Sequence, residues 1–160
     1  MLKEILRILE SDARATPKQI AAMTGISGSE VARLISQAQK DRIILKYKAV
    51  INWDKVENEQ VWALINVKVT PQKDVGFDSI AERVYLFPQA RSVYLASGEY
   101  DLAVLVAGKS EHEVADFVAQ KLATIEGVQG TATHFILKRY KEDGEILTEV
   151  EEVKRQQLVL

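Results

Sequence analysis

The sequence predicts an α+β protein in which a helical N-terminal domain precedes a domain built on an antiparallel β-sheet. Apolar residues recur at helical spacing through the first 40 residues, beginning with Leu2, Ile5, Leu6 and Leu9. From residue 61 onward, β-branched apolar runs and two helical stretches follow one another in the order β-α-β-β-α-β. That order folds into a ferredoxin-like sandwich, with both helices on one face of the sheet.

Composition limits the classes of function that the chain can have. A hydrophobic fraction of 47% in 160 residues is typical of a folded chain of one or two small domains. No apolar run reaches the roughly 18 residues that span a bilayer, and the first 12 residues mix charged with apolar side chains, unlike a secretory signal. We therefore expect a cytoplasmic protein with no membrane partner. With no cysteine, and with His112 and His134 far apart, we expect neither a metal nor a cofactor.

Charge is divided unevenly along the chain. Residues 1–55 carry ten Lys or Arg against six Asp or Glu, a balance of +4, so the net charge of −2 leaves −6 for residues 56–160. This asymmetry favours contact between the first third of the chain and a polyanion.

Two capping boxes predict the helices that follow the first one. Residues 16–19, "TPKQ", provide a hydroxyl cap, a proline at the first helical position and a glutamine that reaches back to the cap. Gly25 can end this helix, and residues 27–30, "SGSE", start the next one. The inner face of that helix is expected to carry Val31, Leu34, Ile35 and Ala38. Two short helices joined by a tight turn make a helix-turn-helix, and the alternative is a plain helical hairpin.

The remaining segments complete the predicted domain organisation. Residues 42–53, "RIILKYKAVINW", read as a basic wing or linker strand, and residues 52–60 are polar enough for a linker. In the tail, Ile146, Val150 and Val153 share one helical face. We expect a winged helix-turn-helix domain over 1–51, a linker over 52–60, the ferredoxin-like domain over 61–141 and a helical extension over 142–160.

The predicted sheet has one face that its own helices do not cover. Its third strand, residues 101–107, "DLAVLVA", offers apolar side chains to both faces, whereas the helices, expected at 74–87 and 110–125, pack on one. A second copy of the same sheet is the simplest cover for the other face, so we expect a homodimer.

Taken together, these segments resemble the Lrp/AsnC, or feast/famine, family of transcription regulators. The resemblance rests on residues 16–44, "TPKQIAAMTGISGSEVARLISQAQKDRII", on residues 92–106, "SVYLASGEYDLAVLV", and on residues 121–138, "KLATIEGVQGTATHFILK". Arg42 stands where the family commonly has a glycine, and the tail is longer than is usual. The resemblance implies a ligand-sensing second domain and assembly of dimers into tetramers or octamers.

The outer face of the helix at residues 28–40 offers side chains that duplex DNA can use. Arg33 can donate two bonds to guanine and Gln37 can pair with adenine, while lysines on the preceding helix and on the wing suit phosphate. The expected DNA-binding residues are Lys18, Ser27, Ser29, Arg33, Ser36, Gln37, Lys40, Lys46 and Lys48. Two such helices in a dimer would read an imperfect palindrome. Each of these residues could instead be an ordinary solvated side chain.

The resemblance also implies a pocket for an amino acid at the loop between the second and third strands, where dimers meet. Asp101 is suited to an ammonium group, and backbone amides near Gly98 are suited to a carboxylate. The expected effector-binding residues are Tyr94, Ala96, Gly98, Glu99, Tyr100, Asp101, Thr131 and Thr133. By composition alone, residues 98–101 favour a simple hairpin turn over a binding site, and it is the resemblance that reverses this preference.

Three functions compete. The first is a transcription regulator whose DNA binding or oligomeric state responds to a small effector, which we expect to be an amino acid. The second is an architectural DNA-binding protein of the same fold without an effector. The third is a small enzyme, but the sequence has no nucleophile and base pair, metal cluster or phosphate-binding glycine loop, so we expect no enzymatic activity.

Overall fold

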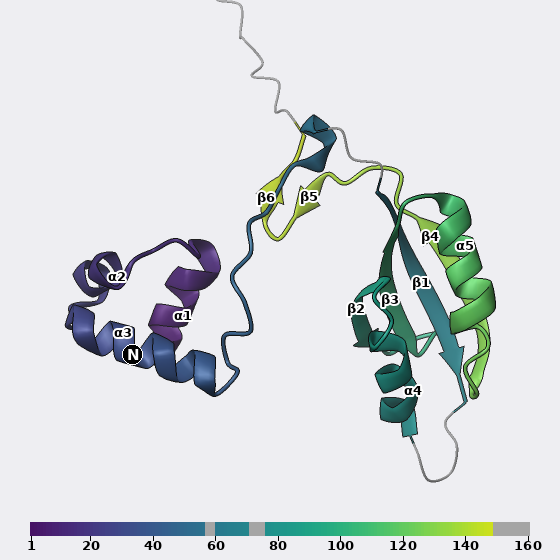
Figure 1. The fold of residues 1–160 in the computed structure, drawn as a ribbon, viewed down its shortest axis with the longest axis horizontal. Helices are drawn as coiled ribbons and strands as arrows, with labels where there is room; N and C mark the ends of the chain where they lie inside the picture. The colour runs from purple at the N-terminus through teal and green to yellow at the C-terminus, as the bar shows by residue number, and fades with distance from the viewer. Residues whose placement is uncertain (57–59, 71–75, 149–160) are drawn as a thin grey trace, which may run out of the picture. The chain divides into compact units, whose positions relative to one another are not determined.

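The computed structural model describes residues 1–56, 60–70 and 76–148 of the chain. The chain divides into two compact units, Met1–Ile51 and Asn52–Leu160 (Figure 1). None of the helices in the described ranges is long and apolar enough to cross a membrane.

Three helices make up the first unit, and all three lie where the apolar spacing predicts them. They are α1 (Leu2–Ser11), α2 (Pro17–Thr24) and α3 (Gly28–Lys40). Their apolar faces meet in a small core of Ile5, Leu9, Ile20 and Val31, with Leu34 and Ile35 partly buried against it. The helix-turn-helix prediction is confirmed.

The turn between α2 and α3 depends on local chemistry at both helix ends. At the start of α2, the Gln19 N–H donates to Thr16 Oγ1 at 3.3 Å and the Thr16 N–H donates to Gln19 Oε1 at 2.8 Å, so the capping box is complete. Gly25 ends α2 with φ 72°, a left-handed conformation that favours glycine. At the start of α3 only half of the predicted box forms: Ser27 Oγ accepts from the Glu30 N–H at 3.3 Å, and the Glu30 carboxylate binds Arg33 instead.

The predicted wing strand is not present. Within residues 1–51, all of which the structure describes, no β-strand follows α3. A strand needs a second strand to accept and donate its backbone hydrogen bonds, and the three helices of this unit supply none. The segment is irregular after residue 44 and almost wholly exposed, and only Ile44 packs against the core.

The second unit contains the predicted order β-α-β-β-α-β. The elements are β1 (Val61–Val69), α4 (Gly76–Tyr85), β2 (Ala90–Leu95), β3 (Leu102–Gly108), α5 (Glu111–Phe117), the π-helical turn η2 (Val118–Leu122) and β4 (Val128–Phe135). The strands pair in the order β2-β3-β1-β4, and all three pairs are antiparallel. This is the ferredoxin-like arrangement.

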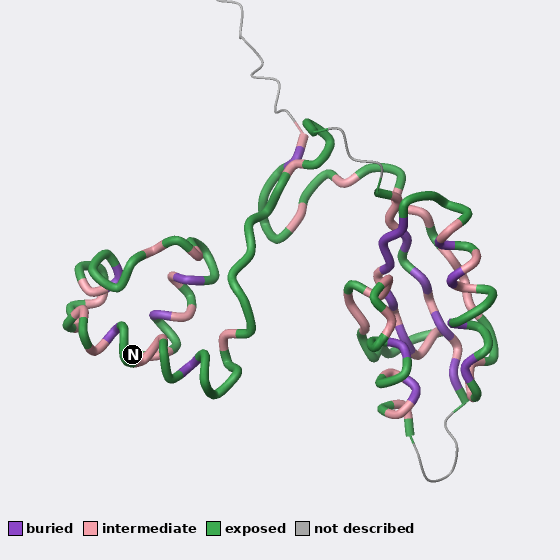
Figure 2. Tube along the Cα trace, viewed as in Figure 1, coloured by how far each residue is buried: buried purple, intermediate pink, exposed green. Residues whose placement is uncertain are grey.

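Alternation along β1 separates the two faces of the sheet. Ala63, Ile65 and Val67 are fully buried, and they share one core with residues of both α4 and α5 (Figure 2). The intervening residue Leu64 is 37% exposed, opposite Leu105 of β3 and His134 of β4. The helices therefore cover one face of the sheet, and the other face, which we call the open face, has no helix over it among the described residues.

The segments that flank the sheet hold two short elements that the sequence did not predict, and only the second contradicts a prediction. In the expected linker, residues 53–55 form a short 3-10 helix, η1 (Trp53–Lys55), capped by the Asn52 side chain. In the expected helical extension, residues 141–146 form a hairpin of β5 (Lys141–Glu142) and β6 (Glu145–Ile146). Asp143 and Gly144 turn this hairpin with φ 45° and 91°, and an Asp-Gly pair is a known signal for such a turn.

A hydrogen bond links these two segments of the second unit. Asn52 Nδ2 donates to the Leu147 carbonyl at 2.7 Å, and the Leu147 side chain is buried. Ile146 thus belongs to a strand, whereas Val150 and Val153 lie outside the described residues.

Candidate functional site

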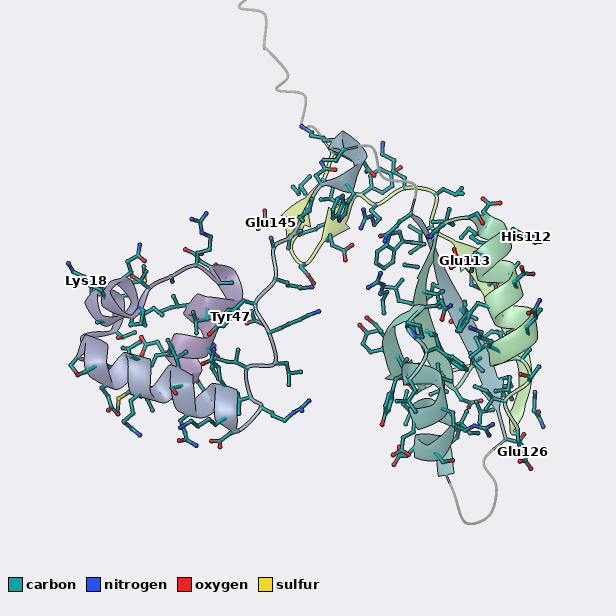
Figure 3. All side chains as sticks on the ribbon, viewed as in Figure 1. Lys18, Tyr47, His112, Glu113, Glu126 and Glu145 are labelled. Atoms are coloured by element: carbon teal, nitrogen blue, oxygen red, sulfur yellow. The ribbon has the colours of Figure 1, made fainter. Side chains whose placement is uncertain are left out.

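The helix-turn-helix turns one face of α3 away from the core of the first unit. Val31 and Ala38 are buried on the inner side, while Ser29, Arg33, Ser36, Gln37 and Lys40 are all exposed on the outer side. Lys18 of α2 and the cap residue Ser27 are exposed as well, and Lys18 projects from the unit in Figure 3. The structure therefore brings these seven expected DNA-binding residues to the surface on neighbouring elements.

Two polar side chains on the outer face of α3 are held by carboxylates of the same segment. Arg33 binds Glu30 through Nε to Oε2 at 2.8 Å and Nη2 to Oε1 at 2.7 Å. Gln37 Nε2 donates to Asp41 Oδ1 at 2.8 Å. The hydrogen bonds with Arg33 lower the pKa of Glu30, and those with Glu30 raise the pKa of Arg33, so both groups are charged at neutral pH.

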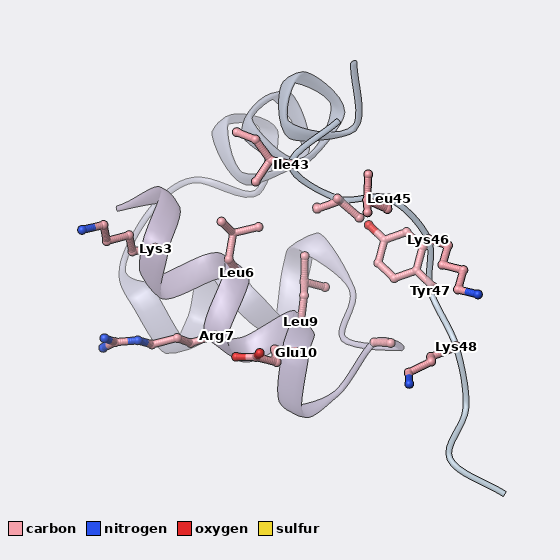
Figure 4. Close-up of a pocket in the computed structure, with 12 residues that line it drawn as sticks. Lys3, Leu6, Arg7, Leu9, Glu10, Ile43, Leu45, Lys46, Tyr47 and Lys48 are labelled. Carbon is pink, nitrogen blue, oxygen red and sulfur yellow. The ribbon is translucent and has the colours of Figure 1, made fainter. Parts of the chain in front are cut away.

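The two remaining expected DNA contacts, Lys46 and Lys48, line a groove of about 590 Å³ between α1 and residues 43–48 (Figure 4). Its lining combines apolar side chains with charged ones: Leu6, Leu9, Ile43, Ile44, Leu45 and Tyr47 with Lys3, Arg7, Glu10, Lys46 and Lys48. A partly apolar lining is not what a phosphate backbone requires, so Lys46 and Lys48 sit in surroundings different from those of the outer face of α3.

In the second unit, the loop between β2 and β3 is tied to the end of β1. The Val69 N–H donates to Asp101 Oδ2 at 2.8 Å, and Lys68 Nζ lies 3.3 Å from the same oxygen. Lys68 Nζ also donates to the Glu99 carbonyl at 2.8 Å. The Val69 hydrogen bond, followed by the Lys68 ammonium, holds the pKa of Asp101 below its ordinary value of 3.8. The Asp101 carboxylate, which was expected to bind an effector, therefore already has two partners in its own chain.

Glycine is required at one point of this loop. Gly98 has φ 143°, a conformation that side chains with a Cβ rarely adopt, and there is open space beside it. Glu99 is exposed and Tyr100 is half-buried. The Ala96 N–H donates to the Asp101 carbonyl at 2.9 Å, which closes the loop.

The structure places the other expected effector residues at the same end of the sheet but on different faces. Thr131 and Thr133 of β4 pair with Val67 and Ile65 of β1, which are buried under the helices. Tyr94 of β2 pairs with Ala103, in the register of the open face, and is 59% exposed. Residues that pair directly across a sheet point to the same face, so the two threonines lie on the helix-covered face and Tyr94 lies on the open face. In one chain, these side chains therefore do not line a single cavity.

Sequence reasoning missed the two β1 residues, Lys68 and Val69, that bind the loop. The alternation of β1 identifies Lys68 as a residue of the open face. However, its contact with Glu99 depends on the pairing of Val67 with Leu102, a register that hydrophobic alternation alone does not specify.

Comparison with known proteins matches both units. Residues 2–44 match the family model of a winged helix-turn-helix DNA-binding domain, and residues 62–146 match that of the Lrp/AsnC ligand binding domain. The uncharacterized HTH-type transcriptional regulator YugG of Bacillus subtilis is 48% identical over 153 residues, which are 95% of this chain and 92% of that protein. The HTH-type transcriptional regulator FL11 of Pyrococcus furiosus is 30% identical over 90% of this chain and 92% of its own length.

Solved structures show the same fold. The transcriptional regulator NMB0573 of Neisseria meningitidis, in complex with L-Met, superposes with a TM-score of 0.69 at 26% identity, over 88% of this chain and 90% of that one. Escherichia coli AsnC superposes with a TM-score of 0.67 at 19% identity, over 92% of this chain and 96% of that one.

A helix-turn-helix with an exposed polar helix, followed by a ligand-binding domain, defines a DNA-binding transcription regulator and not an enzyme. Both matched segments occur here in one chain and in that order. The chain belongs to the Lrp/AsnC family.

Proposed function

We propose that the protein is cytoplasmic and binds duplex DNA sequence-specifically through α3. The observation that carries this proposal is the exposed outer face of α3, on which Ser29, Arg33 and Gln37 follow one another at helical spacing. Such side chains suit base edges, and Lys18 and Lys40 suit phosphate. The positive balance of residues 1–55 adds sequence-independent attraction.

The protein acts as a homodimer that assembles further into tetramers or octamers. Support for the dimer comes from the open face, where the apolar residues Leu64, 37% exposed, and Leu105, half-buried, lie opposite one another on the central strands. A twofold pair of α3 helices would read two half-sites about one helical turn apart, so the operator is an imperfect palindrome.

An amino acid is the proposed effector, bound at the end of the sheet where residues 98–101 meet β1. Support comes from the ligand-binding domain that residues 62–146 match and from the related regulator NMB0573, which was solved with L-Met. Because Tyr94 and Thr131 lie on different faces of one sheet, a complete pocket needs a second subunit. Binding at such a junction shifts the balance among assemblies, and so the way in which operator DNA is held.

One observation favours an architectural protein without an effector. Asp101, the expected partner of the ligand's ammonium group, already accepts a hydrogen bond from the Val69 amide and pairs with Lys68. An ammonium would have to share or displace these contacts, and displacement leaves a polar group of the chain without its partner.

Titration calorimetry against each of the twenty amino acids, followed by measurement of the assembly mass with the best binder, separates the two functions. We expect heat from one or a few amino acids, a change in mass, and weaker binding by Asp101→Asn than by the exposed control Glu82→Gln on α4. If no amino acid gives heat while the same preparation binds duplex DNA tightly, the architectural function is the correct one.

A further inference from the structure

The pair that Glu30 forms with Arg33 has a specific geometry. The carboxylate bonds to Nε at 2.8 Å and to Nη2 at 2.7 Å, so it occupies one side of the planar guanidinium group. A guanidinium has five N–H donors in a fixed plane, and the outer edge formed by Nη1 and Nη2 still has one parallel N–H on each nitrogen. That edge matches the O6 and N7 acceptors of guanine.

The backbone of Glu30 is held by the cap of α3. Its backbone N–H donates to the cap residue Ser27 at 3.3 Å, in the first turn of α3. In α2, the residue at the same distance from the cap, Gln19, bonds back to the backbone of Thr16 at 2.8 Å. Glu30 instead bonds forward to Arg33, one turn along the helix.

Neither fold stability nor simple attraction to DNA accounts for this pair. The Arg33 side chain is 64% exposed, and exposed pairs contribute little to the free energy of unfolding because water and salt screen them. A carboxylate on a DNA-facing surface also repels phosphate, so it lowers affinity for any duplex. What the pair does achieve is to restrict a long, flexible side chain to one orientation before binding.

We propose that Glu30 is a positioning residue for base recognition, holding Arg33 from one side so that its free outer edge reads a guanine in each half-site. The inference rests on the proposed DNA binding through α3. Glu30 raises discrimination in two ways: it removes the entropy cost of ordering Arg33 at the correct base, and its charge weakens binding where no base contact compensates.

The test compares Glu30→Gln, Arg33→Ala and the double variant with the wild-type full chain. Binding-site selection from a duplex library with a random core gives base preferences, and anisotropy titration with an alternating A·T duplex at fixed salt gives affinity without guanine. We expect Glu30→Gln to lose about tenfold of the preference for guanine at the position that Arg33→Ala also affects. On the A·T duplex its affinity stays equal or rises by at most about threefold.

A double-mutant comparison distinguishes positioning from a general effect on the helix. In the Arg33→Ala background, Glu30→Gln should change guanine preference no further, because its effect passes through Arg33. Glu4→Gln, which removes an exposed carboxylate from the first turn of α1, serves as the charge control and should leave base preference unchanged.

Three outcomes would overturn the inference. If Glu30→Gln changes affinity equally for selected and A·T duplexes, Glu30 is only a repelling charge. If guanine preference falls further in the Arg33→Ala background, Glu30 acts independently of Arg33. If Arg33→Ala itself leaves every base preference unchanged, the proposed base contact by Arg33 fails, and positioning by Glu30 fails with it.

Discussion

At the scale of single residues, Asp101 has a structural role, since its side chain connects the loop before β3 to the end of β1. One of its carboxylate oxygens receives both the Val69 amide and the Lys68 ammonium, and only 19% of its side chain is exposed. Together these contacts join the start of β3 to the end of β1. The proposed effector end of the sheet therefore depends on an ionised carboxylate.

This dependence predicts a pH effect on stability. The pKa of Asp101 is lower in the folded chain than its ordinary value of 3.8, so its contribution is complete at neutral pH and is lost progressively as the pH falls through that value toward the folded one. Asp101→Asn should lower the urea midpoint at pH 7, and the difference from the wild type should shrink toward pH 3. Fluorescence of Trp53 and Trp62, both in the second unit, follows the transition.

The exposed residue Glu82 provides the matched control, since Glu82→Gln removes a charge from α4 without touching this loop. A constant difference between Asp101→Asn and the wild type from pH 7 to pH 3 would show that ionisation of Asp101 contributes nothing.

The same residue shows how far sequence reasoning reaches at this scale. Gly98 and Asp101 are recognisable as turn residues because their types are typical of turns. The partners of Asp101 could not be predicted, since Lys68 and Val69 lie more than 30 positions away and meet it only through the β1–β3 register.

At the scale of elements, α3 ends in a common C-terminal motif but has an unusual residue at its left-handed position. Arg42 has φ 57°, and the N–H groups of Arg42 and Ile43 donate to the carbonyls of Gln39 and Ala38 at 3.1 and 2.9 Å. This is the Schellman motif, in which the left-handed position is usually glycine. An arginine there is strained because its Cβ crowds the neighbouring carbonyl.

Arg42→Gly should therefore stabilise the first unit. Relief of the left-handed strain outweighs the greater freedom of glycine in the unfolded chain, for a gain of about 0.5–1 kcal/mol in the free energy of unfolding. Urea denaturation followed by far-ultraviolet circular dichroism measures it. Arg42→Ala is the control, because it removes the same charge but keeps the Cβ, so an equal gain from both variants would attribute the effect to charge.

Local signals predicted most elements well, and they failed where an element needs a distant partner. The boxes at Thr16 and Ser27 and the stop at Gly25 locate α2 and α3 because caps act within a few residues. The hairpin at Asp143 and Gly144 was missed although its turn signal is local, because the apolar spacing of the tail was read as helical. The wing segment has the residues of a strand, but no strand lies beside it within its unit.

At the scale of the whole molecule, the open face is a surface of the sheet that the described residues leave without a covering layer. Leu64 of β1 lies between Leu105 and His134 of the neighbouring strands, and Tyr94 lies further along the same face. Burying such a surface against a second copy would remove apolar area from water on both subunits.

Leu64→Lys should disrupt the proposed dimer. A twofold interface contains each substitution twice. A loss of about 2 kcal/mol of association free energy at each of the two sites therefore weakens association roughly a thousandfold. Sedimentation velocity over a concentration series gives the mass. Leu86→Lys, at the exposed residue after α4, is the control and should keep the wild-type mass. Equal masses for all three proteins would place the assembly surface elsewhere.

The sequence by itself determined the two-domain order, the helix-turn-helix and the ferredoxin-like topology, because periodicity, caps and turn residues act over short distances along the chain. The tertiary structure decided which side chains meet: Arg33 with Glu30, Asp101 with Lys68 and Val69, and Tyr94 on the face opposite Thr131. These contacts follow from rotamers and strand register, and a shift of one residue in register would turn every side chain of a strand to the other face.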